Sequence, residues 1–142
     1  MNVIELIKNN ASEIVTEATS AIERAHLPHY GFAGTGQAKQ RLQTLCDLTL
    51  ECLQTQSTAA MSRYAEKIAG ERFFSGYTLR EVQTAFNLLE ESIWSQILDK
   101  LQVDELATAV TMVNAPLRAG KDAVAHKYFS LLSKPKVSSL DP

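Results

Sequence analysis

Apolar residues recur at intervals of three and four along most of the chain, which is the spacing of one face of an α-helix. The pattern predicts five helices, over residues 3–26, 37–54, 57–74, 78–101 and 104–132. No segment alternates apolar and polar residues for long enough to predict a strand. We therefore expect an all-α fold of five to six helices, arranged as a simple bundle or as a globin-like fold without haem.

Glycine and proline interrupt the helical pattern most clearly in LPHYGFAGTG, residues 27–36. These residues predict a connector between the first two helices. The stretch GFAGTGQAK has the glycine spacing of a phosphate-binding loop, but Gln37 and Ala38 stand where that loop needs Lys followed by Ser or Thr. We interpret it as a plain connector. At the other end, SKPKVSSLDP is polar and holds two prolines. It predicts a flexible tail or linker over residues 134–142, after a helical domain of residues 1–133.

The last predicted helix carries an apolar stripe in heptad spacing, which is typical of a helix that pairs with another. A homodimer seam along this stripe would also offer a route for a signal. The candidate dimer or signalling interface consists of Val103, Leu106, Val110, Val113, Leu117 and Val124. The same spacing suits a helix that faces the core of its own chain, and one stripe does not show which surface covers it. Both interpretations stay open.

Length and charge narrow the class of protein. The chain has 142 residues, with 14 basic and 16 acidic side chains and a net charge of −2. This suits one globular domain, and the balance argues against nucleic acid or an anionic membrane as the main partner. No run approaches the ~18 apolar residues of a membrane span, and the N-terminus lacks the pattern of a signal peptide. We expect a cytoplasmic protein in which Cys46 and Cys52 are buried free thiols.

Candidate chemistry is sparse. The acidic pairs occur in polar helical contexts, and no nucleophile with a base stands out, so we predict no catalytic residue, no cofactor and no metal site. His26, His29 and His126 are expected at the surface or at helix ends rather than as haem ligands. The aromatic residues suggest an alternative function, a module that binds a small molecule between its helices, although aromatics at helical spacing more often belong to a core. The pocket would be lined by Tyr64, Phe73, Phe86 and Trp94.

The segment FFSGYTLREV, residues 73–82, has the features of a corner between two helices. Gly76 can adopt the positive φ that ends a helix. Thr78 and Glu81 have the spacing of a capping box, in which each side chain binds the other residue's backbone N–H. Tyr77 precedes the cap and could pack against Val82. A short corner favours antiparallel packing of the helices it joins.

The surrounding run GERFFSGYTLREVQTAFNLLEESIWSQI, residues 70–97, resembles the N-terminal helical domains of RsbR-type stressosome proteins, and the RsbRD type above all. Such domains also precede some sensor kinases and PucR-type regulators. The resemblance rests on Ser75-Gly76, on Tyr77-Thr78-Leu79, on Glu81-Val82 and on the apolar-Trp pair Ile93-Trp94. It implies a non-enzymatic input domain that forms homodimers and passes a signal along its C-terminal helix to an output module or partner protein. No output module follows within these residues, which leaves open whether the chain is part of a longer regulator.

Overall fold

The computed structural model describes residues 1–133, with the side chains of residues 30–35 left out, and the predicted tail over 134–142 lies outside the described residues. The described part contains no strand, which confirms the predicted all-α class. A short 3-10 helix, η1 (Val103–Glu105), leads into the last helix. The α-helices are α1 (Val3–Ala25), α2 (Pro28–Thr55), α3 (Ala59–Phe74), α4 (Leu79–Lys100) and α5 (Leu106–Ser133).

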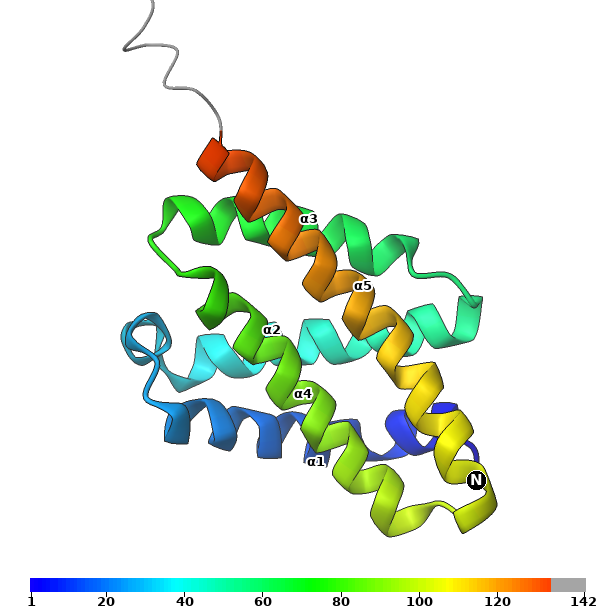
Figure 1. The fold of residues 1–142 in the computed structure, drawn as a ribbon. Coiled ribbons are helices and arrows are strands. Elements are labelled where there is room, and N and C mark those ends of the chain that lie inside the picture. Colours follow the sequence, from blue (N-terminus) through cyan, green and yellow to red (C-terminus); the bar gives the residue numbers. More distant parts are fainter. Residues whose placement is uncertain (134–142) are drawn as a thin grey trace, which may run out of the picture.

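The helices form two layers that cross obliquely (Figure 1). In one layer, α2 lies between α1 and α3. The antiparallel pair α4 and α5 forms the other layer and runs diagonally across the first. Helix α4 packs mainly on α1, and α5 packs mainly on α3. The predicted antiparallel packing of the helices that flank the corner is therefore wrong, because α3 and α4 contact each other only slightly. The apolar face of α3 is covered by α5 instead.

The connector predicted over residues 27–36 is also wrong, because α2 begins at Pro28 and continues through this stretch. Proline suits the first position of a helix, where its missing N–H costs nothing and its fixed φ is already helical. Glycine inside a helix costs only about 1 kcal/mol relative to Ala, so tertiary contacts can override it. The glycines in this stretch thus weaken the helix without ending it.

Helix α5 packs tightly against its neighbours at Gly120. A Cβ atom at this position would lie 2.5 Å from Cε2 of Phe86 on α4 and 3.1 Å from Cγ of Met61 on α3. Phe86 and Met61 are both fully buried. Only glycine leaves room for their side chains, so Gly120 sets how closely α5 packs against both helices.

The first helix changes direction at Asn10, whose φ of −120° and ψ of 17° are not helical. The Asn10 side-chain amide donates to the carbonyl oxygen of Leu6, and its oxygen accepts from Nζ of Lys100 at 2.6 Å. One turn further on, the Ser92 hydroxyl donates to the Ile14 carbonyl oxygen at 2.8 Å. These bonds fasten the irregular part of α1 to α4.

The two cysteines are free and buried, as the sequence predicted. Burial raises the pKa of the Cys46 thiol to about 12, and the nearby Asp47 carboxylate adds to this shift. A thiol with such a pKa stays protonated at neutral pH and is a poor nucleophile.

Candidate functional site

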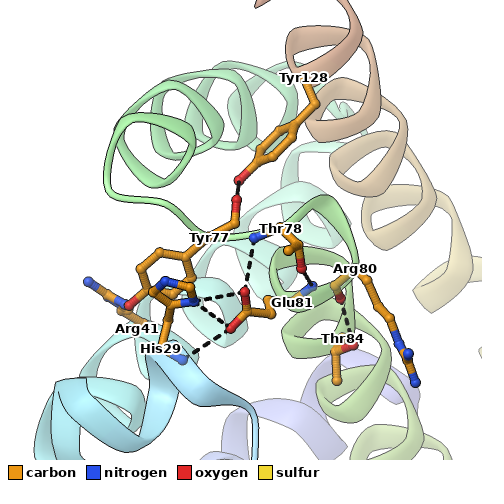
Figure 2. A network of polar contacts seen from close by, with 8 residues as sticks. All are labelled: His29, Arg41, Tyr77, Thr78, Arg80, Glu81, Thr84 and Tyr128. Carbon is orange, nitrogen blue, oxygen red and sulfur yellow. Dashed lines mark hydrogen bonds and ion pairs between the residues drawn. The ribbon is translucent and has the colours of Figure 1, made fainter. Parts of the chain in front are cut away.

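The corner between α3 and α4 holds a network of polar contacts, and its centre is the carboxylate of Glu81 (Figure 2). Glu81 is only 4% exposed. Within α4 it accepts from the Thr78 backbone N–H at 2.9 Å, while the Thr78 hydroxyl accepts from the Glu81 N–H at 3.1 Å. This is the predicted capping box. The preceding Gly76 has a φ of +90°, as expected for a residue that ends a helix.

The same carboxylate also serves the start of α2, which has no side-chain cap of its own. The backbone N–H of His29 donates to Glu81 Oε2 at 3.1 Å, and His29 Nδ1 lies 2.8 Å from Oε1. Because a carboxylate only accepts, Nδ1 carries the hydrogen. One negative charge therefore meets the positive ends of two helix dipoles, α2 and α4.

These donors determine the charge state of Glu81. Burial by itself would raise the pKa of this carboxyl group. The hydrogen bonds from the Thr78 N–H and from the ring and N–H of His29 outweigh burial and hold the pKa of Glu81 below its usual value. Glu81 is therefore ionised at neutral pH, and its contacts favour the folded state as long as it stays ionised.

Tyr77 connects this carboxylate to the rest of the corner. Its ring stacks on the His29 ring, with centroids 4.8 Å apart, and its hydroxyl accepts from Nη1 of Arg41 at 2.9 Å. The Tyr77 carbonyl oxygen accepts from the hydroxyl of Tyr128 on α5 at 2.8 Å. Burial raises the pKa of Tyr128 to about 12, so this hydroxyl stays a donor. Figure 2 shows these residues converging from α2, α4 and α5.

The absence of a side chain at Gly76 leaves room for the His29 ring beside the corner. A Cβ atom at Gly76 would lie 3.3 Å from Nε2 of His29, and its positive φ is unfavourable for other residues. The ring is therefore held between Glu81, the Tyr77 ring and the backbone of Gly76. An imidazole held by these contacts on both of its sides suits a positioning contact between helices better than proton transfer to a substrate.

The aromatic residues predicted to line one pocket are not brought together. Tyr64 and Phe86 both line a cavity of about 20 Å³, but Phe73 and Trp94 do not. The Phe73 ring instead packs edge to face against Phe74 and Tyr128. The cavity has room for little more than one water molecule, far less than a drug-sized ligand needs.

The residues proposed for the dimer interface differ in their exposure to solvent. Val113, Leu117 and Val124 are completely buried within a single chain. Leu106 and Val110 are half-buried, and Val103 is 85% exposed. The buried three belong to the core, as the second interpretation of the stripe expected. The exposed apolar residues near the end of α5 are Phe129 and Leu132.

Several residues of the corner escaped sequence analysis. His29 lies at a helix end, as expected, because it is the second residue of α2, but its contact with Glu81, 52 positions away, was not predicted. Arg41 and Tyr128 come from α2 and α5 and share no motif with the corner. No local signal could have identified them, because only the tertiary fold brings them together. His26 and His126 are exposed, as expected.

Residues 1–133 lack the features of a metal site and of a membrane span. No three His, Cys, Asp or Glu side chains of this part are grouped so that they could hold a metal ion. None of the helices in the same range is long and apolar enough to cross a membrane. Comparisons with protein-family models, with curated proteins and with solved structures found no match to this chain.

Proposed function

We propose that this chain is a non-enzymatic regulatory input domain of the cytoplasm, which senses a signal and passes it through α5 to an output module or partner. The resemblance of residues 70–97 to stressosome N-terminal domains supports this proposal. Homodimerisation belongs to the proposal as well. The buried stripe on α5 packs inside its own chain. An interface on this helix would therefore use its exposed end at Phe129 and Leu132.

The observation that carries the proposal is the 2.8 Å hydrogen bond from Tyr128 to the Tyr77 carbonyl oxygen. It joins the last two turns of α5 to a corner that already holds the ends of α2, α3 and α4. A rearrangement at the corner would change the stability of this end of α5 first. Packed interfaces of this kind switch between discrete arrangements, which is how small shifts are amplified in regulatory proteins.

Hydrogen exchange on Tyr128→Phe tests this route. The substitution removes the hydroxyl and leaves the Tyr77 carbonyl without that donor, which costs about 1–2 kcal/mol. We expect amides of residues 121–133 to exchange up to roughly tenfold faster, whereas amides in the middle of α1 keep their wild-type rates. Equal exchange in α5 of both proteins would show that the corner does not control this helix, and the proposal would lose its main support.

The alternative function is a helical module that binds a small molecule. The cavity beside Tyr64 and Phe86 favours it, although the cavity is too small for most metabolites.

A further inference from the structure

Large apolar side chains stay exposed beside both ends of α5. Leu98 and Val103 lie just before the helix, and Phe74 of α3 lies beside its last turns. Val103 is 85% exposed and Phe74 is 78% exposed, so neither contributes to the core. Apolar side chains that gather on an exposed surface often mark a contact with another molecule.

The surface beside the last turns of α5 is a groove. It lies between α3 and α5 and has a volume of about 520 Å³. Phe74 and Leu131 supply its apolar lining, and Gly70 on α3 contributes no side chain. The residues of the proposed homodimer contact, Phe129 and Leu132, do not line it.

The charged residues of the groove are mainly basic. Arg63, Lys67 and Lys127 line it, against the single carboxylate of Glu66. None of these four belongs to an ion pair within the part of the chain that the structure describes. The groove therefore favours an occupant that is both apolar and acidic.

The surface before α5 is an exposed turn over residues 98–105, which we call the acidic turn. It presents the apolar side chains of Leu98 and Val103 together with the carboxylates of Asp99 and Asp104. Both aspartates are exposed and form no ion pair with any residue in the described ranges. The acidic turn thus has the chemistry that the groove favours.

The basic residue of the turn does not cancel its negative charge. Lys100 is held against α1, where its Nζ donates to Asn10 and lies 3.6 Å from the Glu13 carboxylate. Glu105 adds a third carboxylate to the two aspartates. The turn therefore carries an excess of negative charge.

A single molecule cannot place its own acidic turn in its own groove. Val103 precedes Lys127 by 24 residues, nearly all of them in α5. At 1.5 Å per helical residue, roughly 36 Å separates the two. Figure 1 shows the turn and the last turns of α5 at opposite ends of the fold. Contact between these surfaces requires a second copy of the chain.

We propose that this chain associates head to tail, with the acidic turn of one copy in the basic groove of the next. Val103 lies against Phe74 in this contact, and Asp99 and Asp104 face the lysines of the groove. Because two different surfaces meet, the contact is heterologous and builds rings or open chains rather than a closed dimer. It uses other residues than the homodimer described above, so neither contact depends on the other.

Sedimentation velocity over a concentration series at low salt tests the assembly. Both surfaces are small, so we expect a dissociation constant of roughly 0.1 mM. The mass should rise steadily as the concentration approaches this value, whereas only the proposed homodimer should remain in dilute solution. At about 1 M salt the Debye length is only about 3 Å, and the association should weaken at least tenfold.

Charge reversal tests whether the two surfaces meet. Lys67→Glu with Lys127→Glu, and Asp99→Lys with Asp104→Lys, should each weaken the association at least tenfold, because like charges then face each other. A chain with all four substitutions keeps the wild-type net charge of −2. It should associate again, since its two surfaces are complementary in the opposite sense.

Arg24→Glu with Lys39→Glu is the control for the change in net charge. Both residues are exposed, and neither belongs to the groove or to the acidic turn. This variant should associate nearly like wild type. Circular dichroism checks that each variant is folded, and if one double variant does not fold, the other decides the question.

A mass that stays constant up to the highest concentration would overturn the assembly and leave the groove to a different acidic partner. Undiminished association in a double variant, or no recovery in the folded fourfold variant, would overturn it as well. Phe129→Asp keeps the two proposals apart, because it should abolish the homodimer and leave the salt-dependent rise in mass. Loss of all association in Phe129→Asp would assign it to the end of α5 and reject the head-to-tail contact.

Discussion

Helix α5 is held at two places that differ in chemistry. In its middle, Gly120 lies against Phe86 and Met61 in an apolar, close-packed crossing. Near its end, Tyr128 donates one hydrogen bond to a polar corner built on Tyr77 and Glu81. The first contact depends on volume and shape, whereas the second depends on hydrogen bonds and ionisation. A regulatory input could loosen the end of α5 through the corner without disturbing the crossing that keeps the fold together.

Because the middle of α5 is buried and its end is exposed, we expect an introduced charge to destabilise the fold in the middle but not at the end. The largest loss of stability is expected at Leu117. Leu117 is 0% exposed and Phe129 is 62% exposed. Leu117→Asp places an unpaired carboxylate in the core and should cost about 4–5 kcal/mol or more, enough to unfold a marginal domain. Phe129→Asp should change the free energy of unfolding by only about 0.5 kcal/mol. Urea denaturation followed by circular dichroism measures both.

The same two variants test the proposed homodimer. Light scattering over a dilution series should give a dimer for wild type and a folded species of lower mass for Phe129→Asp. An unchanged dimer in Phe129→Asp would remove the end of α5 from the interface. A folded, soluble Leu117→Asp would contradict the placement of that residue in the core.

The next largest effect is expected at the crossing itself. Gly120→Ala relieves a helical glycine, worth about 1 kcal/mol, but its Cβ would meet Phe86 at 2.5 Å. Overpacking in a full core costs about 1–3 kcal/mol, so we expect net destabilisation of up to about 2 kcal/mol. Gly70→Ala is the matched control on α3, where the nearest atom to the new Cβ is the flexible Lys127 Cε at 3.6 Å. It should stabilise the fold by up to about 1 kcal/mol. Denaturation midpoints that move in the same direction would disprove the close approach.

The contribution of the corner to the free energy of unfolding should depend on pH, whereas that of the crossing at Gly120 should not. Glu81→Gln removes a buried charge and turns an amide N–H₂ toward the donors of His29 and Thr78, at a cost of about 1.5–3 kcal/mol near neutral pH. Because the folded-state pKa of Glu81 is lowered, its stabilisation is present above the unfolded pKa and is lost as pH falls through the folded pKa. The difference between wild type and Glu81→Gln should therefore shrink on acidification.

Thermal unfolding at a series of pH values measures this difference. Glu71→Gln, an exposed residue at the end of α3, is the control and should differ little from wild type at any pH. A stability difference for Glu81→Gln that stays constant from neutral to acidic pH would show that the carboxylate's charge does not matter at the corner.

Local sequence signals predicted the bounds of a helix well wherever capping residues or helix-ending residues stood at both of its ends. The capping box of Thr78 and Glu81 and the positive φ of Gly76 could be predicted because their partners lie within a few residues. The start of α2 could not, because the carboxylate that serves it comes from α4. The distortion at Asn10 was missed for a similar reason, since its side chain also bonds Lys100 at the end of α4.

The sequence by itself determined the all-α class, the corner and the stripes that the core would use, because helix periodicity and capping are local properties. Only the tertiary structure decided that α5 covers α3, that the stripe at Val113 and Leu117 faces the core, and that His29, Arg41 and Tyr128 meet at Tyr77. An amphipathic stripe indicates that one face of a helix will be buried. Which element covers that face is determined by the packing of all the helices together. Function, as we propose it, depends on that second kind of information.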